Sequence, residues 1–235
     1  MRIVLRGEVM AVKFYRKEPC VFCERCRIAL LEKGVSFEEI IVDVRSKPDW
    51  FLVLSPRGKV PVLKHDDVVV FDSAVINEYL DETFPEASLM PSTPDERAKV
   101  RGWIGFANTQ LHQSYMNILR ALPESFDGAV SRFEADLTTL DQALEHSTKL
   151  DPYFNGAQFT LADVTYATIF DRFAVFPNLR NYDLPGGLRR VHLWMETLAS
   201  RPSVVATRPS LEANLENCRR YLPESLRNGI SMPAT

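Results

Sequence analysis

The chain has 235 residues, of which 46% are hydrophobic, so it can bury the core of one or two domains. Its net charge of −3, with both signs interspersed, argues against nucleic acid as a partner, and no apolar stretch is long enough to imply a membrane partner. The segment from Met1 to Phe14 lacks the features of a secretory signal, and the cysteines are clustered instead of spread as a disulfide framework. We therefore expect a cytoplasmic protein.

A short strand followed by a helix opens the chain. The apolar run from Val12 to Tyr15 predicts the strand, and apolar residues at three- and four-residue steps predict a helix from Val21 to Gly34. Cys20 lies at the junction, beside the first backbone N–H groups of the helix. Those groups and the helix dipole favour an anion, and they can lower the pKa of a cysteine from about 8.5 to roughly 3.5–7.5. Cys20 is therefore the first candidate for chemistry.

Cys23 and Cys26 follow Cys20 at three-residue spacing, which raises the question of a metal site. An iron–sulfur run would need a fourth cysteine where Leu30 stands, and a zinc site would need a second Cys/His pair. We expect no metal, because the histidines are solitary: His65, His112, His146 and His192. Cys23 shares a helix face with Cys20 and could resolve a mixed disulfide, whereas Cys26 points elsewhere and is expected to be a buried apolar filler.

Short strands and helices alternate over the next fifty residues. We expect a strand over 36–44, a short helix or turn over 47–51, a loop over 54–59, a hairpin formed by 60–64 and 68–71, and a helix over 72–84. This order indicates a compact α/β unit with a mixed sheet.

The second part of the chain changes character after a linker at 85–94, which holds three prolines. Helical periodicity predicts helices over 95–119, 126–146, 188–198 and 209–222. A further helix should begin at Thr160, because Thr160 and Asp163 have the spacing of a capping box. The predicted organisation is an α/β domain over 1–84, the linker, and an all-helical domain over 95–235.

These motifs, taken together and in order, resemble the glutathione S-transferase superfamily, and within it the omega-like class that uses a cysteine. The resemblance is carried by the segments 20–25, 47–51, 60–63 and 72–81 and by the Thr160-x-x-Asp163 box. It implies a thioredoxin-like, glutathione-binding N-terminal domain and an all-helical C-terminal domain with the acceptor pocket. It also implies glutathione as co-substrate and a homodimer.

The resemblance assigns roles to individual residues. Cys20 would be the nucleophile that forms a mixed disulfide with glutathione. Ser73 and Asp72 would hold the γ-glutamyl end, Lys47 would meet the glycyl carboxylate, and Val60 would bind the cysteinyl part through its backbone. The residues implied to bind glutathione are Phe22, Lys47, Lys59, Val60, Pro61, Asp72 and Ser73. The family has the peptide bond before Pro61 in cis.

A small hydrophobic or disulfide substrate would occupy a pocket between the domains. Its predicted walls are Asn108, Leu111, His112, Tyr115, Tyr166 and Phe170, although an aromatic stripe at helical spacing more often belongs to a core.

The leading interpretation is a glutathione-dependent thiol transferase or reductase, with dehydroascorbate reduction and thioether cleavage as variants of one chemistry. Cys23 either resolves the mixed disulfide, as in dithiol glutaredoxins, or leaves that step to glutathione. The alternative is a non-catalytic binding module resembling the RNA-polymerase-associated stringent starvation protein A. A cysteine at a helix start favours the enzyme, because a binding module does not need one.

Overall fold

The computed structural model describes residues 11–144 and 152–227. The chain divides into two compact units, one ending at Ala87 and the other beginning at Ser88. The predicted linker at 85–94 contains this division. The segment before Ala11 and the predicted helix end at His146 lie outside the described residues.

One mixed sheet forms the framework of the first unit. Its strands are β1 (Val12–Arg16), β2 (Phe37–Ile41), β3 (Val62–His65) and β4 (Val68–Phe71), in the order β2-β1-β3-β4. β1 pairs parallel with β2 and antiparallel with β3, and β3 forms the predicted hairpin with β4. A long crossover, usually a helix, is needed to connect β1 to its parallel neighbour, and the helical segment after Cys20 provides it.

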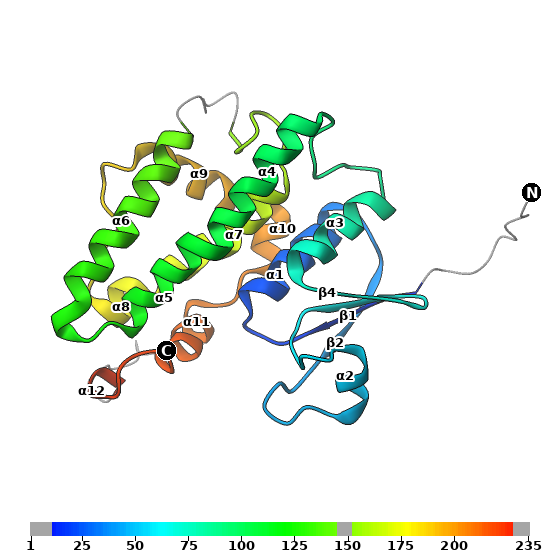
Figure 1. Cartoon of the computed structure of the whole chain (residues 1–235), viewed down its shortest axis with the longest axis horizontal. Helices are drawn as coiled ribbons and strands as arrows, with labels where there is room; N and C mark the ends of the chain where they lie inside the picture. The colour runs from blue at the N-terminus through cyan, green and yellow to red at the C-terminus, as the bar shows by residue number, and fades with distance from the viewer. Residues whose placement is uncertain (1–10, 145–151, 228–235) are drawn as a thin grey trace, which may run out of the picture. The chain divides into compact units, whose positions relative to one another are not determined.

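Three helices cover the two faces of this sheet: α1 (Val21–Glu32), α2 (Asp49–Leu54) and α3 (Ser73–Thr83). Figure 1 shows α1 and α3 on one face and α2 on the other. Side chains alternate along a strand, so Tyr15 and Val62 pack with Phe51 of α2 in one buried cluster. Phe14 and Leu63, which pair across β1 and β3, are also fully buried and face the opposite way. The thioredoxin-like prediction is confirmed.

The second unit is helical, as predicted. It contains α4 (Pro94–Phe106), α5 (His112–Arg120), α6 (Phe126–Ala143), α7 (Leu161–Phe173), α8 (Phe176–Arg180), α9 (Arg189–Ala199), α10 (Pro202–Thr207), α11 (Leu211–Arg219), α12 (Glu224–Arg227) and a 3₁₀ turn at Pro123–Ser125. The helix expected over 95–119 is present, but a π-helical segment at Ala107–Leu111 interrupts its pitch. In Figure 1, α4 and α5 run on from one another beside α6.

The capping box at the start of α7 forms as the sequence predicts. The Asp163 carboxylate accepts hydrogen bonds from the backbone N–H and the hydroxyl of Thr160, both at 2.8 Å. It also accepts from the N–H of Phe154 and from the indole N–H of Trp194, each at 2.9 Å. Burial raises the pKa of Asp163, while these donors act in the opposite direction. One carboxylate thus ties the loop before α7 to α9.

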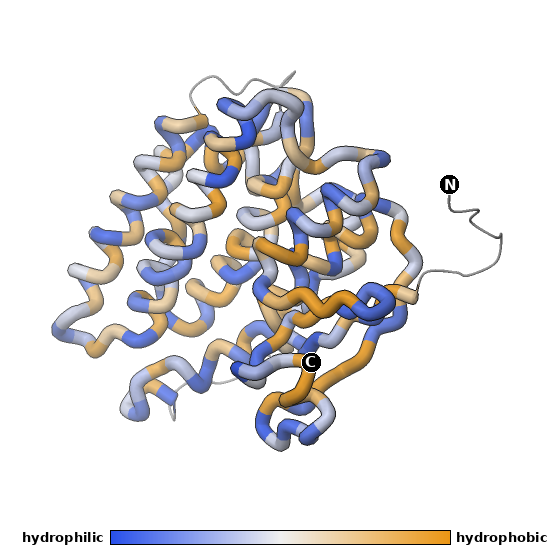
Figure 2. The backbone as a smooth tube through the Cα atoms, turned by 45° about the vertical axis from the view of Figure 1, so that its right-hand side comes forward, coloured by the Kyte–Doolittle hydropathy of each residue, from blue (hydrophilic) through white to orange (hydrophobic). Residues whose placement is uncertain are grey.

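In the second unit, α5 and α6 bury one side, whereas α7 is buried along almost its whole length and circumference. Figure 2 shows hydrophilic and hydrophobic residues alternating along the helices around α5 and α6, the pattern of amphipathic segments. Leu111, Leu119, Phe133, Leu137 and Leu140 are fully buried within the second unit. Among the described residues, no helix is long and apolar enough to span a membrane.

Candidate functional site

The site begins with Cys20, which occupies the N-cap position of α1 with an extended backbone. Its carbonyl accepts the first intrahelical bond, from Glu24 N at 2.9 Å. Its own N–H donates to the Glu24 carboxylate at 3.1 Å. At an N-cap, a serine or aspartate side chain normally accepts from the N–H groups of the first turn. The Cys20 thiol therefore occupies the position where a negative charge is most favoured.

Hydrogen bonding to Cys23 lowers the pKa of Cys20 to about 7. The largest contribution is from the Cys23 side chain; burial opposes it, and the backbone N–H of Cys23 and the charge of Lys17 lower the pKa further. Glu24 acts weakly in the other direction. At neutral pH roughly half of the Cys20 side chains are then thiolates, the reactive form of a cysteine.

The two following cysteines have different surroundings. Cys23 is 1% exposed, and burial together with its bond to Cys20 raises its pKa well above the ordinary value. Cys26 is completely buried, as expected of a filler, and its thiol lies 3.7 Å from the carbonyl oxygen of Ser73. All described cysteines are free thiols. Cys20, which is only partly buried, is the accessible one of the three.

Arg25 is a feature of this region to which the sequence motif gave no role. Its side chain is 1% exposed and lies over the Phe22 ring, 5.0 Å from the centroid. Burial lowers the pKa of Arg25 to about 10. The nearby negative charges of Cys26, Cys20 and Asp72 act in the other direction and raise it. The positive charge of the Arg25 guanidinium is thus held close to the Cys20 thiolate.

A cavity of about 210 Å³ lies beside the start of α3. Six of the residues predicted to bind glutathione line it: Phe22, Lys59, Val60, Pro61, Asp72 and Ser73. The Val60–Pro61 bond is cis, as the resemblance implied. These residues come from the start of α1, the loop before β3 and the turn after β4, so the fold brings together segments that are up to about fifty residues apart.

Asp72 and Ser73 form the acidic and hydrogen-bonding end of this cavity. Asp72 caps α3 by accepting from Ala74 N at 2.9 Å. Its backbone φ of 76° lies in a region that residues other than glycine rarely adopt. Backbone strain of this kind costs about 1–3 kcal/mol and is found most often at functional sites. Ser73 is the first helical residue, so its N–H is available to a carboxylate.

The basic residues that line the cavity belong to the loop over 55–59. Arg57 and Lys59 are both exposed and line the cavity. Ser55 shapes this loop, because its hydroxyl donates to the Lys59 carbonyl at 2.8 Å and accepts from the Lys59 N–H at 3.0 Å. Lys47 does not line the cavity; its Cδ passes 2.8 Å from where a Cβ on Gly58 would lie.

Sequence reasoning missed four residues that line this cavity, namely Ser55, Pro56, Arg57 and Phe71. The first three belong to a segment that its composition identified only as a loop, and a basic residue in a loop is usually an ordinary solvated charge. The signal that could have found them is their position directly before the Val60–Pro61 motif.

The residues predicted for the acceptor pocket lie at different depths of the second unit. Leu111, Tyr115 and Tyr166 are at most 3% exposed. Tyr166 donates its hydroxyl to the Trp103 carbonyl at 3.1 Å, and the Tyr115 hydroxyl lies 3.1 Å from the Cys218 sulfur. These three side chains pack in the core of the unit.

Asn108 and His112 are partly buried, and Phe170 lines a separate cavity within the second unit. The acceptor pocket itself stays a prediction. Among the described residues, no group of three or more potential ligands could hold a metal ion.

The fold, a thioredoxin-like unit followed by a helical one, is that of the glutathione S-transferases. The model of the family's N-terminal domain matches residues 14–88, and that of its C-terminal domain matches residues 123–197. "Glutathione S-transferase DHAR3, chloroplastic" of Arabidopsis thaliana is 32% identical over 82% of this chain and 70% of its own length. The chain belongs to the glutathione S-transferase family and is an enzyme of the glutathione transferase type.

Two solved structures are similar over almost the whole chain. Glutathione transferase Omega 3C from Trametes versicolor has a TM-score of 0.81 at 27% identity and covers 93% of this chain and 91% of its own. The rice glutathione transferase GST1, solved in complex with glutathione, has a TM-score of 0.81 at 25% identity and covers 96% of this chain and 100% of its own.

Proposed function

We propose that this enzyme is a glutathione-dependent thiol transferase whose nucleophile is Cys20. The observation that carries the proposal is the position of Cys20 at the N-cap of α1, with a pKa lowered to about 7 by hydrogen bonding to Cys23. A partly accessible, low-pKa cysteine at a helix start is typical of catalytic thiols, whereas buried structural cysteines are inert.

Two exchange steps complete the reaction. The Cys20 thiolate attacks the glutathione sulfur of a mixed disulfide, the disulfide bond breaks, and the partner leaves as a thiolate that takes a proton from solvent. A second glutathione, as its thiolate, then attacks the glutathione sulfur of the Cys20 adduct. Glutathione disulfide is released and Cys20 returns to a thiolate, so one free glutathione thiol is consumed for each partner thiol that is released in its reduced form.

Recognition of glutathione would use the charges around the cavity of the first unit. The tripeptide carries two carboxylates and one ammonium group, and so needs both signs of charge in separate places. Asp72 and the N–H of Ser73 would receive the γ-glutamyl ammonium and carboxylate, respectively. Arg57, Lys59 and the nearby Lys47 would attract the glycyl carboxylate. The backbone of Val60 would pair with the cysteinyl residue.

In an alternative route for the second step, Cys23 would act as the resolving thiol in place of the second glutathione. It attacks Cys20 Sγ in the glutathione adduct, passes its proton to the departing glutathione, and leaves a Cys20–Cys23 disulfide that two further glutathione molecules reduce. Its hydrogen bond to Cys20 supports this role, while its burial slows it. Mass spectrometry after treatment with oxidised glutathione tests it: Cys23→Ser should accumulate an adduct that wild type lacks. Equal adduct levels in the two proteins would leave resolution to glutathione.

Dehydroascorbate is the first acceptor to test, since the name of the Arabidopsis relative includes DHAR. Two glutathione thiols would supply the two electrons and two protons of that reduction.

We further propose a cytoplasmic homodimer. Free, clustered cysteines fit a reducing compartment such as the cytoplasm. For the dimer, the supporting observation is an exposed apolar patch on α2, where Trp50, Leu52 and Val53 expose 49%, 42% and 82% of their surface.

A coupled assay with a glutathione mixed disulfide tests the proposed function. Wild type should catalyse the exchange, and Cys20→Ser should lose at least about a hundredfold in rate, because an alcohol at this position is not ionised at neutral pH. Cys26→Ser is the matched control, since this buried cysteine has no part in the proposed reaction, and it should retain the rate. A Cys20→Ser variant with full activity would refute the proposal.

A further inference from the structure

Glu24 is an acidic residue of the first turn of α1 that lies next to the reactive thiol and is almost completely buried. It is 7% exposed. Its carboxylate accepts a hydrogen bond from the backbone N–H of Cys20 at 3.1 Å, and its own N–H donates to the Cys20 carbonyl at 2.9 Å. Both backbone polar groups of Cys20 are therefore bound by this one residue.

The contact between the Glu24 carboxylate and the Cys20 N–H resembles one half of a capping box. In a capping box, the side chain at the third helical position reaches back to the N–H of the N-cap residue. Cys20 is the N-cap residue of α1, and Cys23 occupies the third position. A thiol accepts hydrogen bonds only weakly, and the Cys23 side chain is already hydrogen bonded to Cys20. Glu24, at the fourth position, makes the contact instead.

The charge of Glu24 is unfavourable for the Cys20 thiolate. Hydrogen bonding to Cys23 and the charge of Lys17 lower the pKa of Cys20, but the carboxylate of Glu24 acts in the opposite direction and raises it. Arg25 is the other charged group close to this thiol. A neutral residue in place of Glu24 would favour the thiolate more, because like charges disfavour each other. The role of Glu24 therefore lies in its contact with the Cys20 backbone and not in stabilising the thiolate.

The backbone of Cys20 determines where its sulfur lies. Because both the N–H and the carbonyl of Cys20 are bound, the direction of its Cα–Cβ bond is fixed. Glutathione would be held separately, in the cavity lined by Phe22, Asp72 and Ser73. A displacement of about 1 Å between reacting groups can slow a reaction about a hundredfold. The orientation of Cys20 thus matters most for a disulfide that is already bound.

We propose that Glu24 is a positioning residue for thiol exchange, whose carboxylate fixes the backbone of Cys20 so that its sulfur meets a disulfide bound in the cavity of the first unit. The inference rests on the proposed function, because it takes Cys20 as the nucleophile. It adds to that function by assigning the orientation of the nucleophile to a residue that does not line the cavity.

Three substitutions separate the contact from the charge. Glu24→Gln keeps an oxygen that can accept from the Cys20 N–H and removes the charge. Glu24→Asp keeps the charge, but its shorter side chain does not reach that N–H, and Glu24→Ala removes both. Ile28→Val is the control for stability, because Ile28 is completely buried in the same helix and has no part in the reaction.

Two reagents are compared at about pH 9, where Cys20, with a pKa of about 7, is a thiolate. The first is the mixed disulfide of glutathione and thionitrobenzoate, in single turnover without free glutathione. The Cys20 thiolate attacks its glutathione sulfur, the disulfide bond breaks, and coloured thionitrobenzoate leaves as a thiolate. The second reagent is iodoacetamide, which alkylates Cys20 without being bound first. A loss of position slows the first reaction, whereas a loss of folding or ionisation changes both.

The ratio of the two rates, mixed disulfide over iodoacetamide, is the readout. It should fall roughly tenfold in Glu24→Asp and Glu24→Ala, and it should change less than about threefold in Glu24→Gln and Ile28→Val. In a pH titration of alkylation, the pKa of Cys20 should fall in Glu24→Gln, because a like charge is removed.

This inference alone is overturned if Glu24→Asp and Glu24→Ala keep the wild-type ratio, or if Glu24→Gln loses as much as Glu24→Asp. The proposed function is overturned with it if wild type does not release thionitrobenzoate, or if Cys20→Ser releases it as fast as wild type.

Discussion

Replacing Cys23 by alanine should raise the pKa of Cys20. The Cys23 side chain makes the largest contribution to the low pKa, about 7, of Cys20. A hydrogen bond to a charged group stabilises it by about 1.5–3 kcal/mol, and about 1.4 kcal/mol corresponds to one pKa unit. The pKa of Cys20 should therefore rise to roughly 8–9 in Cys23→Ala, and the thiolate fraction at pH 7 should fall from about half to a tenth or less.

Alkylation by iodoacetamide as a function of pH, with the modified peptide identified by mass spectrometry, measures this change. The rate at pH 7 should fall roughly three- to tenfold, because the more basic thiolate is also more nucleophilic and offsets part of the loss. Cys23→Ser is the control: its hydroxyl can still donate, so most of the pKa lowering should remain. A Cys20 pKa near 7 in Cys23→Ala would refute the reasoning and assign the effect to the helix N-terminus alone.

Three further predictions follow from the same geometry. Transferase activity should fall as the pH drops through about 7, because protonation removes the Cys20 thiolate; a flat profile down to pH 5 would contradict this. Asp72→Asn combined with Lys59→Ala, on a Cys20→Ser background, should weaken glutathione binding roughly ten- to a hundredfold by calorimetry, and unchanged affinity would argue against these contacts. Asp163→Ala should lower the free energy of unfolding by about 3 kcal/mol or more, because it leaves buried donors unpaired; a loss below about 1 kcal/mol in denaturant titration would be inconsistent with that network.

The fold could be predicted to a large extent because its local signals agree with its tertiary contacts. The apolar run at Val12, the hairpin around Asp66 and the box formed by Thr160 and Asp163 each correspond to an element of the structure. The π-helical segment at Ala107–Leu111 could not be predicted, since an extra residue in a helical turn leaves no periodic signal. The short helices α8, α10 and α12 span less than two turns, so they are too short to show a helical periodicity and were not predicted.

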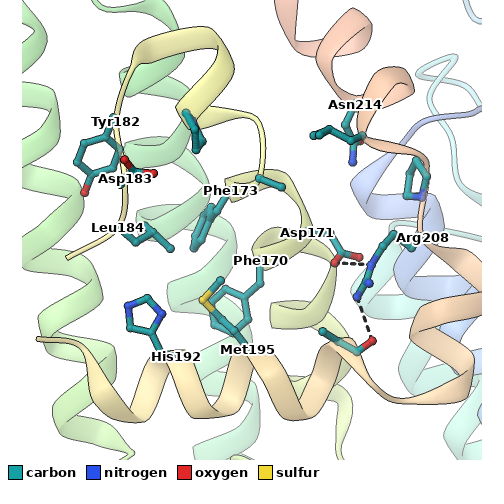
Figure 3. Close-up of a pocket in the computed structure, with 15 residues that line it drawn as sticks. Phe170, Asp171, Phe173, Tyr182, Asp183, Leu184, His192, Met195, Arg208 and Asn214 are labelled. Carbon is teal, nitrogen blue, oxygen red and sulfur yellow. Dashed lines mark hydrogen bonds and ion pairs between the residues drawn. The ribbon is translucent and has the colours of Figure 1, made fainter. Parts of the chain in front are cut away.

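The candidate site could be predicted only where a motif names its residues. Cys20, Val60 and Ser73 stand in segments with recognisable local patterns. Arg57 does not, because its place in the cavity depends on how the loop after α2 folds back before β3. The cavity of the second unit, which Phe170 and Asn214 help to line (Figure 3), was also beyond sequence reasoning, since its shape is a property of packing and not of composition.

Peptide mapping of the glutathione adduct tests the central claim, that Cys20 carries the exchange, most directly. Cys23→Ser would be mixed briefly with oxidised glutathione at pH 7, quenched with acid, digested and analysed by mass spectrometry. The proposed mechanism predicts one glutathione per chain, attached to Cys20, and none on the buried Cys26 or Cys218. An adduct on another cysteine, or no adduct at concentrations where glutathione binds, would contradict the claim and favour a binding module that makes no use of the thiol.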